Sequence, residues 1–369
     1  MSTQPAVDAP DLAALYEDFD RAGLAPLWTQ RADLMPPAPS GPARAAVWAW
    51  STLLPLAQRA GDLVPVGRGG ERRAIALANP GLAGRPYATP TLWAAVQYLG
   101  AGEVAPAHRH SQGAFRFMLE GAAVWTVVDG DPVEMREGDV LLTPAWTWHE
   151  HRSESTGPAV WLDGLDIPLV HDLDAGFFQP GHSADVAGVL AGRSVSRSER
   201  LWGHPGLHPL GVAAESDFDS PLLAYRREHI AAALSEQLCL EAEGTASVLG
   251  PGHAAVRFVN PASGADALST MRLEMHRLAP GAGFEPERCV GSSVWQVFEG
   301  AMTVWLEGDR HDVSSGDVFV VPSWCSLRLA TGAVAADLFV FSDAPVFEKL
   351  GLSARHSRGV AEFMQRARP

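Results

Sequence analysis

The sequence predicts an all-β protein built from two small jelly-roll β-barrels, with an N-terminal arm and a few helices. Three observations lead to this fold class. Short β-rich runs alternate with Gly, Asp-Gly and Pro turns, one such stretch recurs later in the chain, and helical periodicity is confined to a few segments. The 369 residues, 47% hydrophobic and 19% charged, are enough for two domains that each have a core.

The N-terminal 90 residues differ from the rest in composition. A helix is expected over residues 11–22, because apolar side chains recur there at helical spacing between a capping Asp11 and a terminating Gly23. The following residues are rich in Pro, Gly and Ala, and the segment ARAAVWAWSTLLPLAQRAG suggests a second helix. Several tryptophans make a free linker improbable, so we expect residues 1–90 to form an arm wrapped on a larger body.

From Thr91 the chain reads as strands, with runs such as TLWAAVQYL, FRFMLEG and DVLLTPAWTW. This texture fades and later returns, and in between one helix is expected to begin with Ser220 as its cap and Pro221 in its first position. The predicted divisions are an arm over 1–90, a first barrel over 91–170, a helical connector over 171–250, a second barrel over 251–345 and a tail over 346–369.

The two strand-rich regions are copies of one unit. GAAVWTVVDGDPVEMREGDVLLTPAW in the first half matches GAMTVWLEGDRHDVSSGDVFVVPSW in the second. The matched positions lie 178 or 179 residues apart throughout, and the clearest pairs are Gly121 with Gly300, Gly138 with Gly316 and Pro144 with Pro322. A constant offset of this kind indicates an internal duplication.

Composition excludes several classes of function. The formal net charge is -15 and no Lys/Arg-rich block occurs, which argues against a nucleic-acid partner. No uncharged apolar run reaches the ~18 residues that a membrane helix needs. The first residues lack the basic and apolar regions of a secretory signal, and the three cysteines are widely separated. A cytoplasmic protein without disulfides is therefore expected.

Histidines cluster in the first copy at strand spacing. Side chains at positions i and i+2 lie on one face of a strand, so His108 and His110 share a face, as do His149 and His151. Arg116 joins the first pair if the strand parity holds, and WLDGLD adds Asp163. Burying this set unpaired would cost several kcal/mol, whereas a metal ion would satisfy the imidazoles together.

These residues resemble the two motifs of the cupin family. The matching positions are Gly102, His108, His110 and Gly121 for the first motif, and Gly138, Pro144 and His149 for the second. Ala114 stands where many cupins have a glutamate ligand, so the resemblance implies a metal site of three histidines without a carboxylate. It also implies that the two barrels form a bicupin.

The wider sequence is similar to the gentisate 1,2-dioxygenase family of bicupins. The resemblance rests on NPGL, TLWAAVQYLGAGEVAPAHRHSQGAFRF, GDVLLTPAWTWHEH and WLDGLDIPLV. It implies Fe(II) on His108, His110 and His149, and cleavage of gentisate by O2 between the carboxylate-bearing and adjacent hydroxyl-bearing carbons to give maleylpyruvate. It further implies a homo-oligomer, a tetramer in relatives.

Roles for the remaining polar residues follow from this resemblance. Arg116 suits the substrate carboxylate, because a guanidinium offers a bidentate fork that stays protonated. His151 is expected to bind a ring hydroxyl or to move its proton, and Asp163 to orient His151 or accept from a hydroxyl. The predicted pocket contacts are Trp93, Gln97 and an arginine of the arm that reaches an active site, Arg72 or its neighbours Arg68 and Arg73.

The second copy departs from the metal-binding pattern. It has Glu287 and Cys289 where the first has His108 and His110, and Leu327 replaces His149. One glutamate and one thiol make a poor iron site, so the second cupin is expected to be structural and Cys289 to be a small buried residue.

Alternatives to gentisate cleavage remain open at this point. The same chemistry on salicylate or 1-hydroxy-2-naphthoate would use the same motifs. A metal-dependent sugar isomerase or epimerase, and a non-catalytic binding cupin, are more distant possibilities, since cupins host all of these.

Overall fold

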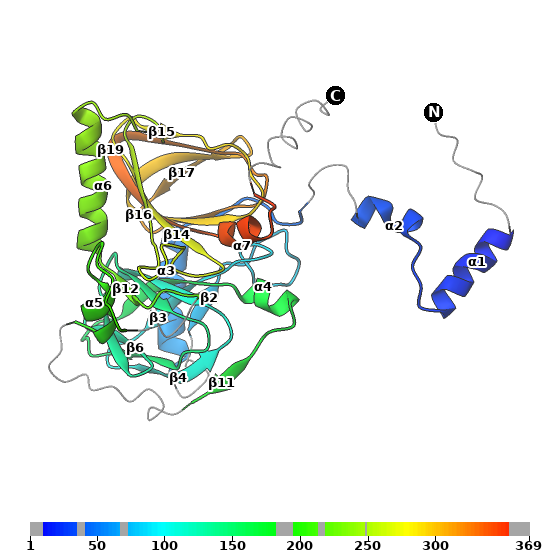
Figure 1. Cartoon of the computed structure of the whole chain (residues 1–369), viewed down its shortest axis with the longest axis horizontal. Coiled ribbons are helices and arrows are strands. Elements are labelled where there is room, and N and C mark those ends of the chain that lie inside the picture. The colour runs from blue at the N-terminus through cyan, green and yellow to red at the C-terminus, as the bar shows by residue number, and fades with distance from the viewer. Residues whose placement is uncertain are drawn as a thin grey trace. The chain divides into compact units, whose positions relative to one another are not determined.

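The computed structural model describes residues 10–34, 41–66, 73–181, 195–212, 218–247 and 249–353. The chain divides into two compact units, one of Met1–Gly41 with Glu362–Pro369 and the other of Pro42–Ala361. The second unit holds both β-rich regions (Figure 1).

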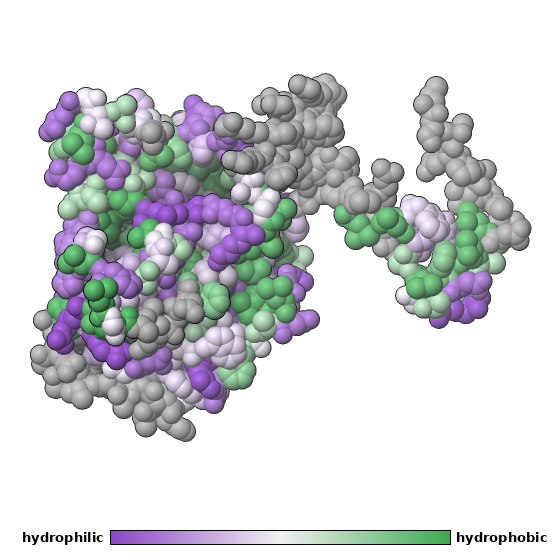
Figure 2. Space-filling view, viewed as in Figure 1, coloured by the Kyte–Doolittle hydropathy of each residue, from purple (hydrophilic) through white to green (hydrophobic). Residues whose placement is uncertain are grey.

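The described residues of the first unit form two helices, α1 (Pro10–Arg21) and α2 (Leu27–Leu34). The helix expected over residues 11–22 is thus confirmed, and Gly23 follows it with a positive φ of 67°. Asp11 lies within the helix and is not its cap, because the helix begins one residue earlier. The rings of Phe19 and Trp28 pack edge to face at 6.1 Å, and Trp28 Nε1 donates to the Tyr16 hydroxyl at 3.2 Å. Figure 2 shows apolar side chains on the surface of both helices, and the exposed apolar residues there include Leu15, Leu27 and Trp28.

The first cupin consists of two antiparallel sheets. One has the strand order β12-β8-β5-β10-β3-β2 and the other β11-β4-β9-β6-β7. Apolar side chains from both sheets, among them Met118, Val124 and Trp161, form one core cluster between the layers. The strands are β2 (Ala74–Ala76), β3 (Trp93–Leu99), β4 (Val104–His110), β5 (Ala114–Glu120), β6 (Val124–Val128), β7 (Asp131–Met135), β8 (Val140–Thr143), β9 (His149–Ser153), β10 (Ala159–Leu165), β11 (Phe178–Pro180) and β12 (Ala224–Tyr225).

The second cupin is a single eight-stranded sheet with the order β1-β18-β16-β19-β14-β13, to which β15 and β17 add at the sides. Its two longest strands, β16 and β19, correspond to β5 with β6 and to β9 with β10 of the first cupin. Each continues from one layer of the barrel into the other, so the two layers form one sheet. The strands are β1 (Ala46–Trp48), β13 (His253–Arg257), β14 (Arg272–Leu278), β15 (Gly283–Phe284), β16 (Ser293–Leu306), β17 (Asp309–Ser314), β18 (Val318–Val321) and β19 (Leu327–Ser342). The predicted all-β bicupin fold is confirmed.

In the described part of the second unit, five helices accompany the sheets, and no helix of the described ranges is long and apolar enough to cross a membrane. They are α3 (Trp50–Leu63), α4 (Ile167–Asp172), α5 (Arg197–Trp202), α6 (Arg227–Ala242) and α7 (Ala344–Lys349). The longest, α6, lies along the side of the second cupin (Figure 1).

The predicted start of α6 at Ser220 is wrong, because the helix begins at Arg227. The intervening residues are extended, since Ala224 and Tyr225 pair with β8 as strand β12. Arg226 then points into a buried ion pair with Asp139 and Glu199. Tertiary pairing therefore overrides a local Ser-Pro start signal.

The arm and the connector each contribute a strand to one cupin and a helix that packs against the other. Strand β1 of the arm pairs with β18 of the second cupin, while α3 after it contacts β3 of the first. Strand β12 of the connector pairs with β8 of the first cupin, while α6 contacts β13 and β14 of the second. The duplicated unit thus includes a strand and a helix before each cupin.

Aromatic packing joins the two cupins. Phe115 and Phe117 project from the outer face of β5, where the Phe117 ring stacks on Phe339 at 4.3 Å and the Phe115 ring meets Phe341 at 4.8 Å. They belong to one hydrophobic core that spans both cupins. Because side chains alternate along a strand, Arg116 between them points into the first cupin.

Candidate metal centre

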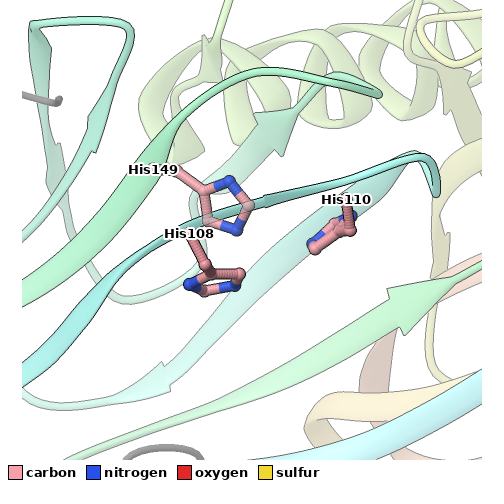
Figure 3. A group of neighbouring side chains, drawn as sticks. All are labelled: His108, His110 and His149. Carbon is pink, nitrogen blue, oxygen red and sulfur yellow. The ribbon is translucent and has the colours of Figure 1, made fainter. Parts of the chain in front are cut away.

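Three imidazoles converge inside the first cupin. His108 and His110 lie on β4, and His149 begins β9, directly opposite His108 in the strand register. Ligand nitrogens of the three rings lie within 4.8 Å of one another, and all three residues are buried (Figure 3). Among the described residues this is the only group of three or more His, Cys, Asp or Glu with metal-ligand spacing.

Backbone carbonyls orient each ring. The Nδ1 atoms of His108, His110 and His149 lie 2.9, 2.9 and 3.0 Å from the carbonyl oxygens of Pro106, Gln112 and Thr147. A carbonyl only accepts, so each Nδ1 carries the hydrogen and each Nε2 is presented as a ligand, which is the usual outer-shell support of a metal-bound histidine.

The state of His149 fits a resident metal. Its Nε2 is buried and has no hydrogen-bond partner among the described residues. Burial, aided by the positive potential of His108 and Arg116, holds the pKa of His149 well below its usual value. The ring is therefore neutral, the form in which imidazole binds a metal ion. An orphaned ligand nitrogen that lies beside two further imidazoles is satisfied by a cation.

A cavity of about 550 Å³ opens beside the centre and is lined by His108 and His110. Its volume lies in the range of small-molecule sites. Its lining is partly apolar, and Phe178 of β11 stacks over His108 with 5.4 Å between ring centroids. Polar side chains also line it, among them Gln97, Gln112, Arg116, His151 and Asp163. The cavity thus suits a flat ring that carries polar substituents.

Arg116 and Asp163 form a buried pair at the cavity. They face each other on β5 and β10, with 3.5 Å between Arg116 Nε and Asp163 Oδ1. Trp161 Nε1 donates to the same carboxylate oxygen at 3.0 Å, and the Arg116 guanidinium donates to Thr143 Oγ1. Burial raises the pKa of Asp163 to about 6, although Arg116 opposes the rise, and burial also lowers the pKa of Arg116.

His151 follows His149 on the same face of β9 and lines the cavity. Its Nδ1 lies 2.9 Å from Thr126 Oγ1 on the neighbouring strand β6. The expected partner for this ring, Asp163, is engaged by Arg116 and Trp161. No motif singled out Thr126, because a threonine on a strand is ordinary until its neighbours are known.

The other predicted contacts divide into two groups. Trp93 and Gln97 of β3 both line the cavity, as expected. Arg68 and Arg72 lie outside the described residues. Arg73 is directed elsewhere, since it pairs with Glu103 and donates to the carbonyl of Val64, so its role is structural. The sequence did not indicate Phe178, which comes from the connector and joins the wall only through the pairing of β11 with β4.

Comparison with known proteins agrees with this site. The family model for the cupin domain matches residues 95–165. A gentisate 1,2-dioxygenase of Streptomyces sp is 59% identical over 348 residues, which cover 94% of this chain and 96% of that protein. The chain belongs to the gentisate 1,2-dioxygenase family. It is therefore a ring-cleaving dioxygenase.

Solved structures of relatives share the whole architecture of this dioxygenase. The salicylate 1,2-dioxygenase of Pseudaminobacter salicylatoxidans superposes with a TM-score of 0.89 at 51% identity, covering 94% of this chain and 98% of that one. A 5-aminosalicylate 1,2-dioxygenase of Comamonas sp is 37% identical over 93% of this chain and 89% of its own length. The family thus includes proteins named for several hydroxylated aromatic acids.

The second cupin of this dioxygenase has no comparable centre among its described residues. At the positions that correspond to the ligands, Leu327 is buried in an apolar core and Cys289 is exposed. The expectation of a buried Cys289 is wrong, because residues 285–289 precede β16 as an irregular segment at the surface.

Proposed function

We propose that this dioxygenase uses Fe(II) to open gentisate between the carboxylate-bearing and the adjacent hydroxyl-bearing carbons, giving maleylpyruvate. One observation carries the proposal. Three carbonyl-oriented imidazoles present Nε2 beside a cavity that also contains a buried arginine. Relatives named gentisate 1,2-dioxygenase support the substrate, the first at 59% identity.

His108, His110 and His149 would hold the iron, and when bound it would supply electron exchange between an electron-rich ring and O2. Imidazole ligands suit Fe(II) but also other first-row metals, so the choice of iron rests on the family chemistry. The absence of a carboxylate ligand keeps the centre more positively charged than a site with two histidines and one carboxylate. An anionic substrate complements that charge.

The chain's own side chains would bind and orient the substrate. Arg116 would take the carboxylate, because its buried guanidinium keeps a fork of donors at the cavity. Asp163 would hold Arg116 in place through their ion pair. His151 would accept from the ring hydroxyl, and Trp93 and Gln97 would flank the ring. We also propose a homotetramer, in which Arg72 contacts substrate.

A second candidate substrate is salicylate or 1-hydroxy-2-naphthoate. It is favoured by the likeness to salicylate 1,2-dioxygenase, one structure of which is described as adducts with gentisate and is 52% identical with a TM-score of 0.90. A protein named 1-hydroxy-2-naphthoate 1,2-dioxygenase from Nocardioides sp. is 32% identical over 353 residues. Both candidates need the same centre and differ in ring substitution.

Anaerobic loading with Fe(II) followed by an oxygen-electrode assay tests the proposal. The panel is gentisate, salicylate, 5-aminosalicylate and 1-hydroxy-2-naphthoate. We expect gentisate to have the highest kcat/KM, with one O2 consumed per ring opened. Fast turnover of another acid without turnover of gentisate would refute the substrate.

A further inference from the structure

We propose that Thr126 is a positioning residue for the ring-cleaving reaction. Its hydroxyl holds His151 as the tautomer whose Nε2 faces the substrate as a hydrogen-bond acceptor. This inference rests on the proposed function in one respect, namely that the substrate hydroxyl binds at His151.

The geometry places three buried residues in a row across three strands. Thr126 on β6 lies directly opposite His151 on β9 in the strand register. Thr126 Oγ1 is 2.9 Å from His151 Nδ1 and 3.1 Å from the sulfur of Met135 on β7. All three side chains are almost fully buried, so solvent does not compete for the hydroxyl.

The proposed tautomer corresponds to one assignment of the hydrogens in this row. The hydroxyl of Thr126 donates to the sulfur of Met135, which can only accept. A hydroxyl has only one hydrogen, so in this assignment Thr126 Oγ1 accepts from His151 Nδ1–H. In the Nδ1–H tautomer the other ring nitrogen, Nε2, carries the lone pair.

This tautomer suits the chemistry of the cavity. His151 lines the cavity, and its Nδ1 is engaged by Thr126 of β6, so Nε2 is the nitrogen through which the ring would meet substrate. A ring hydroxyl donates to an Nε2 lone pair, whereas the opposite tautomer would present a second donor to it. Arg116 already supplies donors for the carboxylate. His151 as an acceptor and Arg116 as a donor therefore distinguish the hydroxyl of the substrate ring from the adjacent carboxylate.

The second cupin supplies an independent argument. The positions that correspond to Thr126, Met135 and His151 are Val304, Val313 and Leu329, which pair in the same registers and are all buried and apolar. The cupin that lacks the metal ligands thus lacks the whole row. Val304 also shows that a valine, which has nearly the shape of threonine, packs well at this point of the fold.

Matched substitutions test the proposal. Thr126→Val removes the hydroxyl and keeps the shape, while Thr126→Ser keeps the hydroxyl. In the iron-loaded enzyme we expect Thr126→Val to lower kcat for gentisate by about tenfold, the scale of one hydrogen bond, with little change in KM because Arg116 still binds the carboxylate. Thr126→Ser should restore kcat to near the wild-type value. Equal metal content and equal unfolding temperature would exclude loss of the centre or of the fold.

A spectroscopic measurement tests the tautomer without substrate. Zinc-loaded protein with ¹⁵N-labelled histidine should give a His151 signal pattern for Nδ1–H in the wild type and Thr126→Ser, and a mixture of tautomers in Thr126→Val. His151→Asn identifies the signals. An Nε2–H pattern in the wild type, or the same pattern in wild type and Thr126→Val, would overturn the proposal. Failure of gentisate turnover with the expected pattern intact would refute the substrate and leave the assignment of Thr126 standing.

Discussion

The two cupins share a fold and differ in what fills it. The first surrounds a polar centre, whereas the second has apolar side chains at most of the corresponding positions and a buried His253–His276 pair. When the two copies are matched by their strand registers, polar residues of the first occupy the positions of apolar residues in the second. The equivalent positions are Arg116 and Trp295, Thr126 and Val304, His149 and Leu327, His151 and Leu329, and Asp163 and Val340. The same backbone therefore tolerates either interior.

Structural features, by contrast, are kept in both copies. Trp146 and Trp324 have the rare positive φ values of 68° and 67°, and their amides donate to the carbonyls of His110 and Cys289 at 2.7 and 2.8 Å. A strained φ at a bulky residue persists only where its surroundings enforce it. The turn geometry is thus independent of whether a metal ligand lies nearby.

Helix starts are also set in the same way in both copies. Asp139 accepts from the amide of Arg227 at 2.8 Å, and Asp317 accepts from the amide of Trp50 at 2.7 Å. The glycine before each aspartate is required, because a Cβ at Gly138 or Gly316 would collide with the first residue of the same helix. The two copies therefore share the contacts that start each helix, while the residues inside the two cupins differ.

The largest effect is expected when the first interior is given the residue of the second. His149→Leu should abolish metal binding and reduce turnover by more than about 1000-fold, because two imidazoles cannot complete the centre. Leu327→Met, a change of similar size in the second cupin, should leave both unchanged. Metal analysis measures the metal content of each variant, and oxygen uptake measures its turnover. Full metal occupancy in His149→Leu would contradict the ligand assignment.

A smaller loss is expected at the buried ion pair. Arg116→Met should raise KM for gentisate by about 100-fold, the loss of charge-assisted hydrogen bonds to a carboxylate, while metal content is kept. It also leaves Asp163 buried without its cation, so the free energy of unfolding should fall by about 3 kcal/mol. The double variant Arg116→Met with Asp163→Asn should recover most of that stability. An unchanged KM would remove Arg116 from carboxylate binding.

The raised pKa of Asp163 predicts how pH affects the pair. Its pKa is about 6 in the fold against an ordinary 3.8, so the folded protein binds more protons between these values. This carboxyl therefore favours folding below about pH 4, and that contribution is lost as the pH rises to 6. Unfolding of wild type and Asp163→Asn should show the variant gaining relative stability across this window. A constant difference would contradict the shift.

The smallest losses of stability are expected at two equivalent aspartate–threonine hydrogen bonds that join the cupins. Asp166 accepts from Gly113 N of its own cupin and from the Thr270 hydroxyl of the other at 2.6 Å. Asp343 likewise accepts from Ser292 N and from the Thr91 hydroxyl. Thr270→Val and Thr91→Val should each lower stability by about 1 kcal/mol, a shift of about 2–4 °C in Tm. Markedly unequal shifts in thermal unfolding would show that the two bonds are not equivalent.

Much of the fold and of the centre was predictable from short-range patterns. Strand runs, turn glycines and the constant repeat offset led to a bicupin, and the spacing of His108, His110 and His149 led to the metal site. These patterns work because strand periodicity puts alternate side chains on one face whatever the partners are. The first helix was also predicted, since its apolar spacing and its stop at Gly23 are local, although it begins at Pro10 and Asp11 is not its cap.

What failed depended on distant partners. The Ser220–Pro221 start was wrong because β8 recruits the following residues into a sheet. Cys289 was expected in a core but lies at the surface. Of the three arm arginines offered for an active site, Arg73 alone is described, and it is bound to Glu103. No local signal in the chain reports these contacts.

The sequence by itself determined the alternation of inward and outward side chains, the duplication and the set of metal-binding histidines, because each depends on spacing along one strand. Only the tertiary structure decided which groups hold those side chains in place. The Asp163–Arg116 pair, the Thr126–His151 hydrogen bond and the wall formed by Phe178 each join residues from different strands. Their contact energy depends on strand register, and register is fixed only when the sheets assemble.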